Sequence, residues 1–116
     1  ERAAMVAKED LALHVWGLEK VYRRWLCTRQ APKRAVRGLS FAIHSGEVFG
    51  LLGHNGAGKT SAIKCFVGEQ CITAGTVHVG GCDMERDTGA ARRRLGYCPQ
   101  FDALLELLTV QDHLEL

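Results

Sequence analysis

Residues 53–60 read Gly-His-Asn-Gly-Ala-Gly-Lys-Thr, and this stretch decides how the rest of the chain is interpreted. It fits the pattern G-x-x-x-x-G-K-[ST] of a phosphate-binding loop, or P-loop, which requires a strand before it and a helix after it. Glycines let the backbone fold closely around phosphate, so that successive N–H groups point inward at the start of a helix. The stretch therefore predicts a site for an anionic phosphate chain.

The flanks of the loop supply the context that the pattern requires. Val48–Leu52, just before it, is continuously apolar, which predicts a buried strand in the centre of a sheet. After the loop, apolar residues at helical spacing are followed by Gly68, which predicts a helix that ends there. A glycine turn without a ligand is the competing interpretation, and the strand–loop–helix order disfavours it.

Single positions in the loop have separate predicted roles. We expect Lys59 to reach the β- and γ-phosphates and the Thr60 hydroxyl to ligate Mg²⁺. Ser61 would donate to the α-phosphate, although an ordinary serine in the first helical turn is an equally good interpretation. His54 has no predicted catalytic role, and we expect it to be exposed to solvent. The predicted phosphate-binding residues are Gly53, Asn55, Gly56, Ala57, Gly58, Lys59, Thr60 and Ser61.

Before the loop, the chain alternates between apolar and polar residues in two places. Residues 11–15 and 39–43 follow the period of a half-buried strand. Between them, Arg23–Arg37 gathers basic residues around a proline without a helical or strand period, which predicts a solvated loop. Glu1–Asp10 is polar and rich in alanine, and we interpret it as a linker.

After the P-loop helix, four further elements are predicted. Thr76–Val79 predicts a strand that ends at a Gly-Gly turn, and Thr88–Arg94 predicts a short helix. The three arginines that close this helix are interpreted as a solvated helix end and not as a lipid or phosphate site. Leu95–Cys98 predicts a strand, and Thr109 with Asp112 forms a T-x-x-D capping box that opens a final helix.

Composition excludes several classes of function for this segment. The net charge is +2 and no Lys/Arg block is long enough to form a nucleic-acid stripe, so we expect no nucleic-acid partner. No apolar run approaches the ~20 residues needed to cross a bilayer, and we expect this segment to be soluble. Five cysteines without a C-x-x-C pair indicate neither a disulfide framework nor a zinc site, so reduced cytosolic thiols are expected.

A P-loop alone is shared by kinases, GTPases, helicases and ABC ATPases, and the surrounding residues distinguish among them. Lys-Val-Tyr at 20–22, Gly-Leu-Ser-Phe at 38–41, Gly-Glu-Val-Phe-Gly-Leu-Leu-Gly at 46–53 and Tyr-Cys-Pro-Gln at 97–100 resemble an ABC ATPase. The resemblance implies an α/β fold: a P-loop NTPase core with an N-terminal antiparallel β portion, truncated before the helical subdomain is complete. Residues 11–116 would form a partial ABC-type ATP-binding domain.

The resemblance extends to one subfamily. Gly-Tyr-Cys-Pro-Gln-Phe-Asp-Ala at 96–103 and Leu-Leu-Thr-Val at 107–110 are similar to the A subfamily, whose characterised members mostly move lipids. For the intact parent this implies ATP hydrolysis coupled to transmembrane transport, with this domain on the cytoplasmic side of the membrane. The implied partners are a second nucleotide-binding domain, arranged head to tail, and the transmembrane domains of the parent.

The resemblance also assigns residues outside the P-loop. Tyr22 would stack on the adenine of ATP, and Val36 would pack against the same base. Trp25 is a rival for the stacking role. Gln100 would be the Q-loop residue, a catalytic position whose amide coordinates Mg²⁺ and orients the attacking water.

Several family motifs have no counterpart in this chain. The signature motif, the Walker B aspartate, the catalytic glutamate and the switch histidine all follow the Q-loop in an ABC ATPase, and none occurs before Leu116. This predicts a fragment or a truncated product. Two alternatives stay open: a catalytically incomplete nucleotide-binding fragment, and a soluble ABC ATPase that is not a transporter.

Overall fold

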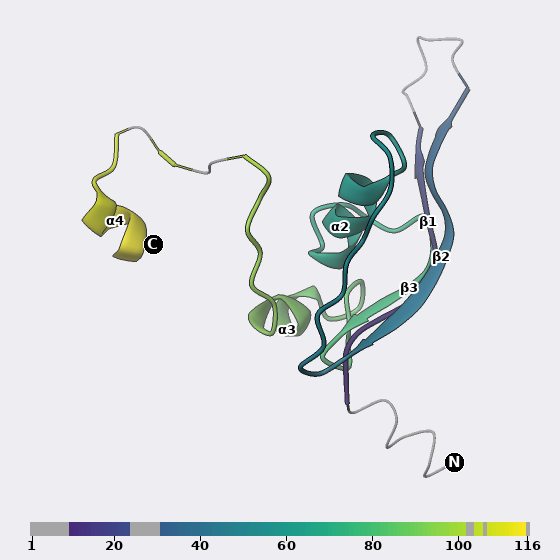
Figure 1. Cartoon of the computed structure of the whole chain (residues 1–116), viewed down its shortest axis with the longest axis horizontal. Coiled ribbons are helices and arrows are strands. Elements are labelled where there is room, and N and C mark those ends of the chain that lie inside the picture. Colours follow the sequence, from purple (N-terminus) through teal and green to yellow (C-terminus); the bar gives the residue numbers. More distant parts are fainter. Residues whose placement is uncertain (1–9, 24–30, 102–103, 106, 116) are drawn as a thin grey trace.

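The computed structural model describes residues 10–23, 31–101, 104–105 and 107–115 (Figure 1). The elements of this part of the chain are β1 (Leu11–Tyr22), β2 (Lys33–His44), α2 (Lys59–Phe66), β3 (Ala74–Val79), β4 (Cys82–Asp83), α3 (Thr88–Arg93) and α4 (Val110–Glu115). The predicted linker, apart from Asp10, lies outside the described residues. A membrane-spanning helix is not found in the described part of the chain, where no helix combines enough length with enough hydropathy.

The strands form one antiparallel sheet in the order β2-β1-β3-β4. The central strand β1 pairs with β2 from Leu11 opposite His44 to Tyr22 opposite Lys33. Its other edge pairs with β3, where Val15 lies opposite Val77. The strands predicted at residues 11–15, 39–43 and 76–79 are therefore confirmed, and each is longer than its alternating segment.

The predicted loop over Arg23–Arg37 is wrong in its last third, because β2 already begins at Lys33. In the observed sheet β2 is an edge strand, so one side of it faces solvent and tolerates charged side chains. Arg34 illustrates this, since its Nη2 lies 2.9 Å from Glu19 Oε2 on the neighbouring strand. Residues 24–30, and with them Trp25, lie outside the described residues.

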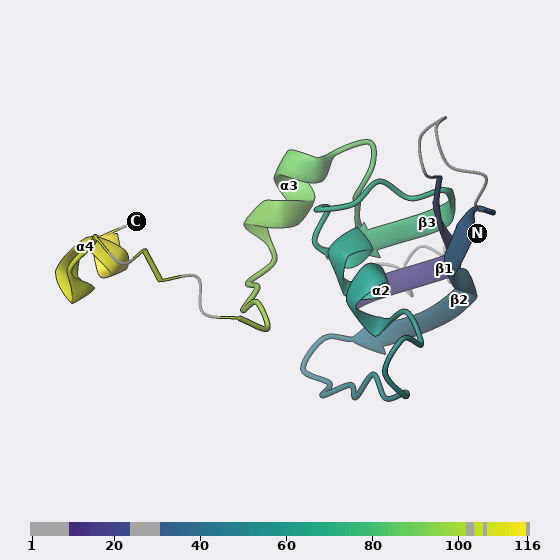
Figure 2. The same ribbon diagram turned by 90° about the horizontal axis from the view of Figure 1, so that it is seen from above.

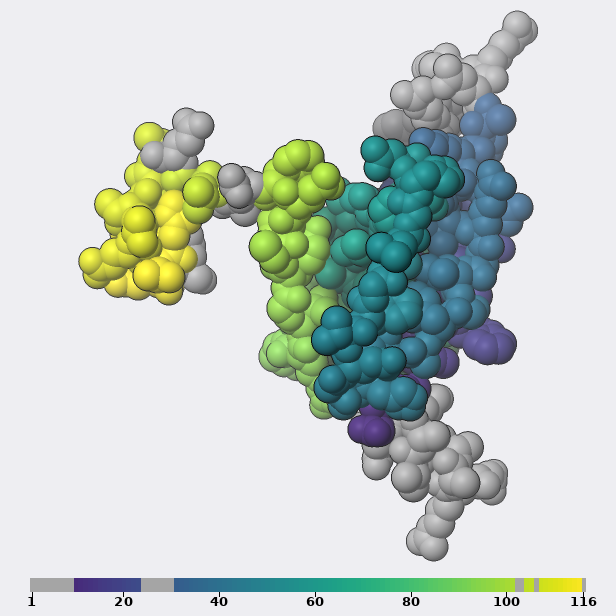
Figure 3. All heavy atoms as spheres, viewed as in Figure 1, coloured from purple at the N-terminus to yellow at the C-terminus, as the bar shows by residue number. Residues whose placement is uncertain are grey.

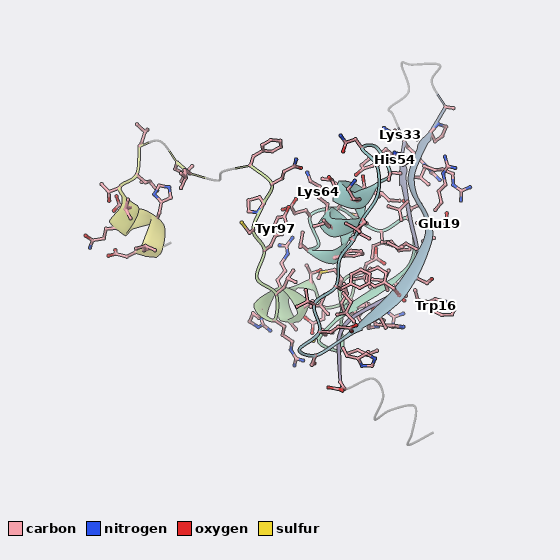
Figure 4. All side chains as sticks on the ribbon, in the orientation of Figure 1. Trp16, Glu19, Lys33, His54, Lys64 and Tyr97 are labelled. Carbon is pink, nitrogen blue, oxygen red and sulfur yellow. The ribbon has the colours of Figure 1, made fainter. Side chains whose placement is uncertain are left out.

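Helices α2 and α3 cover one face of the sheet and enclose the core (Figure 2). Val15 and Leu18 of β1, Cys65 of α2 and Ala91 of α3 have no exposed surface. Burying an aliphatic side chain of this size stabilises the fold by roughly 1.5–3 kcal/mol. The same burial raises the pKa of the Cys65 thiol, chiefly by desolvation. On the other face Trp16 points away from the helices and is largely exposed (Figure 4).

The segment before the P-loop departs from the prediction. Val48–Leu52 forms no strand, and the side chains of Val48 and Leu52 are 99% and 92% exposed. A strand needs a partner for its backbone groups, and no described strand pairs with this segment. Phe49 stacks on Phe41 of β2 with ring centroids 4.7 Å apart, and Leu51 packs against the core, so side chains hold the segment next to the sheet.

The strand predicted at Leu95–Cys98 is wrong for the same reason. These residues form no strand, and the Tyr97 side chain, labelled in Figure 4, is 41% exposed. No strand in the described part of the chain lies alongside to pair with it. Local apolar composition therefore overestimates strand content where the pairing partner is missing from the sheet.

The predicted helices are confirmed together with their ends. Helix α2 stops where Gly68 adopts φ +72°, and the Glu69 N–H then donates to the Lys64 carbonyl at 2.8 Å. Helix α3 begins at Thr88 and is capped by Asp87, whose carboxylate accepts from the Ala90 N–H at 3.1 Å. The capping box at α4 also forms, because the Thr109 N–H donates to Asp112 Oδ2 at 2.9 Å.

The arginines at the end of α3 do more than face solvent. Arg92 donates from Nε to the Val67 carbonyl at 3.3 Å and from Nη2 to the Gly68 carbonyl at 2.8 Å. Arg94 donates to the Gly80 carbonyl after β3. All three arginines are exposed, as expected, but Arg92 joins α3 to the C-terminal end of the P-loop helix. This contact holds α2 in place from the end opposite the loop.

Candidate functional site

The P-loop lies between the exposed segment Val48–Leu52 and α2, and two of its glycines have left-handed backbone conformations. Gly56 has φ +87° and Gly58 has φ +96°, a region that other residues rarely adopt. A Cβ on Gly58 would come within 2.1 Å of the Ala35 carbonyl oxygen. The loop can therefore approach β2 this closely only with glycine at position 58.

A β-bulge in β2 produces this close approach. Lys20 lies opposite Val36 but Val21 lies opposite Arg34, so Ala35 is the extra residue on β2. A bulge bends its strand and changes the direction of the groups next to it. Here the carbonyl of the bulged residue lies against the P-loop, which fixes the position of the loop relative to the sheet.

The start of α2 is built to accept an anion. Its N-cap residue Gly58 provides no side-chain cap, and its first turn contains no acidic residue. The N–H groups of the first turn and the positive end of the helix dipole are then available to a ligand. This arrangement suits phosphate, because a helix N-terminus attracts negative charge.

The Lys59 side chain folds back over its own loop. Its Nζ donates to the Gly53 carbonyl and, at 2.9 Å, to the His54 carbonyl. A cation is thereby held inside the curve of the loop, where phosphate oxygens could replace the carbonyls as its partners. His54 itself is exposed, as expected (Figure 4), and its Nδ1 lies 2.9 Å from the Asn55 carbonyl oxygen.

Two cavities adjoin the loop, and their linings differ in chemistry. A cavity of about 590 Å³ is lined by apolar side chains such as Leu39, Leu51 and Leu52 together with Arg34, Arg37, His54 and Lys59, and no hydroxyl or carboxamide side chain is among the described residues that line it. A smaller cavity of about 310 Å³ is lined by hydroxyl, amide and cationic groups. The residues that line it are Tyr22, Lys33, Arg34, Ala35, Asn55, Gly56, Gly58, Lys59, Thr60, Ser61 and Gln100. Cations line both cavities, and we take the smaller one as the candidate site because it adds the hydroxyl and amide groups of Asn55, Thr60, Ser61 and Gln100.

The electrostatics of the candidate site favour an anion. Lys33, Arg34 and Lys59 contribute three positive charges, and no carboxylate is among the described residues that line it. The sequence predicts only the charge of Lys59 at this site, because Lys33 and Arg34 fall in the predicted loop. Their presence follows from the start of β2 at Lys33, which places both beside the P-loop.

The predicted residues do not all meet at one cavity. Tyr22 and Gln100, which are far apart in sequence, both line the smaller cavity with the P-loop and the first turn of α2. Val36 and Ala57 line the larger cavity instead, and Gly53 lines neither. Val36 is also a core residue with only 7% of its surface exposed. Tyr22 and Val36 were both expected to contact adenine, but they line two different cavities, which adjoin the same loop.

Tyr22 is held by two contacts. Its hydroxyl donates to Ser61 Oγ at 3.3 Å, which joins the end of β1 to the first turn of α2. The Lys20 Nζ lies 5.0 Å from the centroid of the Tyr22 ring. Lys20 was missed by the sequence analysis. The sequence did contain a signal for it. Lys20 follows Leu18 by two residues and precedes Tyr22 by two, so the three side chains lie on the same face of β1.

Comparisons with known proteins identify the family of this chain. The sequence model of the ABC transporter family matches residues 36–115. The rat phospholipid-transporting ATPase ABCA3 is 48% identical over 105 residues, which are 90% of this chain and 6% of that protein. ABC transporter A family member 7 of Arabidopsis thaliana is 52% identical over 98% of this chain and 12% of its own length. The chain thus spans only a small part of these relatives.

A solved structure gives the same assignment. The ATP-binding subunit of an ABC transporter aligns with 90% of this chain and 40% of its own, with a TM-score of 0.73 and 27% sequence identity. The α/β architecture expected of a partial ABC ATPase is confirmed by this likeness. Because the family model matches well over half of the chain, this protein belongs to the ABC transporter family.

Proposed function

We propose that this chain binds Mg-ATP as part of a nucleotide-binding domain, formed by residues 11–116 and preceded by a linker at residues 1–10. The observation that carries the proposal is the smaller cavity. There a tyrosine ring, the P-loop, the uncapped start of α2 and Gln100 come together around three cations, and the described lining residues include no carboxylate. A triphosphate with an attached base fits this combination of charge and aromatic surface.

The phosphate chain would be held by backbone and cation together. The N–H groups of Gly58, Lys59 and Thr60 at the start of α2 would bind phosphate oxygens, with Ser61 nearest the α-phosphate. Lys59 would leave the Gly53 and His54 carbonyls and turn to the β- and γ-phosphates. The charge on Lys59 is thereby available at the point where phosphate charge is greatest.

The donor set also fits a magnesium ion. The Thr60 hydroxyl and the Gln100 amide oxygen are hard oxygen ligands, which Mg²⁺ prefers, and both line the same cavity. When bound, Mg²⁺ neutralises charge on the phosphates. Gln100 would in addition orient the attacking water in an intact catalytic site. Both residues are exposed, so the ligand can reach them.

The base would stack on Tyr22. An aromatic ring at the edge of the phosphate cavity offers the flat apolar surface that adenine requires. Val36 faces the same side of the sheet, because it lies opposite Lys20 and Lys20 is two residues from Tyr22. We propose Val36 as a second and smaller contact of the base.

For the intact parent we propose ATP hydrolysis coupled to transmembrane movement of lipid. The support is the family and the names of the relatives, two of which are phospholipid-transporting ATPases of rat and human. The proposed partners are a second nucleotide-binding domain arranged head to tail and the transmembrane domains. The domain would lie on the cytoplasmic side of the membrane, and no nucleic acid is involved.

One observation favours a narrower function for the chain taken alone. Among the described residues that line the candidate cavity there is no carboxylate to polarise a water molecule. Hydrolysis by an ABC ATPase depends on such a group, and the family motif that supplies it has no counterpart here. The chain by itself would then hold ATP without turning it over.

The phosphate site is tested by removing the Lys59 cation. We expect Lys59→Ala to abolish measurable Mg-ATP binding, because a charge-assisted contact worth on the order of 2–4 kcal/mol is lost. The matched control is Lys64→Ala on the same helix, whose lysine pairs with Glu69 and should not affect the ligand. Calorimetric titrations that are equal for wild type and Lys59→Ala would overturn the proposal.

A further inference from the structure

Lys20 is a buried cation without a role in phosphate binding. Only 8% of its surface is exposed, and it lies in β1 among core residues. None of the ion pairs found among the described residues includes it. Lysine is seldom buried unless its charge is compensated, because desolvating an ammonium is costly. Its two compensating contacts therefore indicate what the residue does.

The first contact is a hydrogen bond and the second is an aromatic ring. The Lys20 Nζ donates to the Cys71 carbonyl at 2.6 Å, which fixes the ammonium. The same Nζ lies over the Tyr22 ring, 5.0 Å from its centroid, within the range of a cation–π interaction. Tyr22 is thus held at one face by Lys20 and at its hydroxyl by Ser61.

Lys20 contacts the Tyr22 ring from outside the smaller cavity. Tyr22 lines the smaller cavity, whereas Lys20 does not. Because the cation covers one face of the ring, a stacked base would have to use the other face. A cation also draws π-electron density toward itself, so the free face repels the π cloud of an aromatic base less.

We propose that Lys20 is a positioning residue for recognition of the purine base. It acts through Tyr22, whose ring it holds at the cavity with one face open and made more receptive to adenine. The inference rests on the proposed function, since it assumes that Tyr22 is the residue that stacks. It predicts that Lys20 contributes to binding of the base and contributes nothing to binding of the phosphates.

The test compares a ligand that has a base with one that lacks it. Affinities of the 116-residue chain for Mg-ATP and for Mg-tripolyphosphate are measured by calorimetry in wild type, Lys20→Met and Lys20→Arg. We expect Lys20→Met to weaken ATP binding about two- to fivefold, which is less than the loss expected when the stacking ring itself is removed, and to leave tripolyphosphate affinity unchanged. Lys20→Arg, which keeps the cation, should bind ATP nearly as wild type does.

Two controls separate positioning from structure and from net charge. Lys64→Met removes the same charge from α2 and should leave both affinities unchanged. Lys20→Gln keeps a donor for the Cys71 carbonyl but carries no charge, so it replaces Lys20→Met if that variant does not fold. In a Tyr22→Ala background, loss of the Lys20 charge should not change the ratio of the two affinities any further.

Different results of this assay would overturn the inference about Lys20 and the proposed function. If Tyr22→Ala lowers the ratio of ATP to tripolyphosphate affinity but the neutral Lys20 variant does not, the inference alone is overturned. The inference is also overturned if the neutral Lys20 variant loses affinity for ATP and for tripolyphosphate equally, since a lysine with a purely structural role would have this effect. If Tyr22→Ala itself leaves the ratio unchanged, the proposed stacking fails and the role of Lys20 fails with it.

Discussion

At the scale of single residues, Gly58 carries much of the site. Its backbone is left-handed, and its α-carbon faces the Ala35 carbonyl at a distance that leaves no room for a Cβ. The sequence motif identifies this glycine as part of a loop, but the motif does not explain why it must be glycine. The structure adds the reason, which is contact with the bulge in β2.

We therefore expect Gly58→Ala to displace the loop and to abolish ATP binding. Gly46→Ala is the matched control, because Gly46 has φ +77° but nothing within 4 Å of its Cβ position. That control should lose only the roughly 1–2 kcal/mol of a left-handed non-glycine residue. Urea unfolding and ATP titration of both variants measure the difference. Equal destabilisation, with ATP binding retained in Gly58→Ala, would show that the bulge does not constrain the loop.

Tyr22 carries the prediction for base recognition. We expect Tyr22→Ala to weaken ATP binding by roughly 1–3 kcal/mol, by analogy with bases stacked on aromatic residues in nucleic-acid sites. The variant should also discriminate less between ATP and tripolyphosphate, because only the base contact is lost. Trp25→Ala provides the comparison in the same assay. A loss of discrimination in Trp25→Ala with none in Tyr22→Ala would reassign the stacking residue.

At the scale of elements, α2 connects the site to the rest of the fold. Its N-terminus lies at the proposed anion site, and its C-terminus is held by Gly68 and by the guanidinium of Arg92. The Tyr22 hydroxyl contacts its first turn from β1. The position of the phosphate site thus depends on contacts made at both ends of one short helix.

We expect Arg92→Met to destabilise the fold by about 1–2 kcal/mol, since two hydrogen bonds to carbonyls at the end of α2 are lost from an exposed guanidinium. Arg93→Met removes the same charge from the neighbouring position of α3 and should change stability little. The midpoints of thermal unfolding give the comparison. If both variants unfold at the same temperature, Arg92 is only the solvated helix end that the sequence suggested.

The elements also show which parts of the fold could be predicted. Helix ends, the capping box at Thr109 and the glycine at position 68 depend on neighbouring residues, so the sequence predicted them correctly. The pairing of β-strands, in contrast, depends on residues that are distant in the sequence. The apolar run Val48–Leu52 was therefore predicted as a strand although no described strand lies beside it, and the bulge at Ala35 was not anticipated.

The same distinction applies to the candidate site. The P-loop residues follow from a local motif, and Tyr22 and Gln100 from a family resemblance, so the sequence could name them. Lys20 has no motif of its own, and its contacts with Cys71 and Tyr22 exist only in the folded sheet. Val36 was named for its place in the family pattern, which does not reveal that it also packs in the core.

At the scale of the whole molecule, the chain consists of a packed part and an extended part. The sheet with α2 and α3 forms the packed part, while α4 lies apart from it (Figure 3). Large apolar side chains are exposed along the extended part, including Phe101, Leu107 and Leu114. Gln100, which lines the candidate site, directly precedes the exposed Phe101.

We expect the isolated chain to bind ATP weakly and to hydrolyse none above background. Phosphoryl transfer depends on positioning and charge stabilisation, and the cavity offers Lys59 and Gln100 but no carboxylate among its described residues. Phosphate release from the wild-type chain is compared with that from Lys59→Ala. Turnover that depends on Lys59 would contradict this account and would require another catalytic base.

The central claim is that ATP binds at the P-loop in the smaller cavity, which Tyr22 also lines. Backbone NMR of the chain during a Mg-ATP titration tests this claim most directly. The account predicts that the largest amide shifts occur at Gly56–Ser61, with a further shift at Tyr22. Tripolyphosphate should reproduce the shifts at Gly56–Ser61 and leave Tyr22 unchanged. Shifts centred instead on Leu39, Leu51 and Leu52, which line the larger cavity, would contradict the claim.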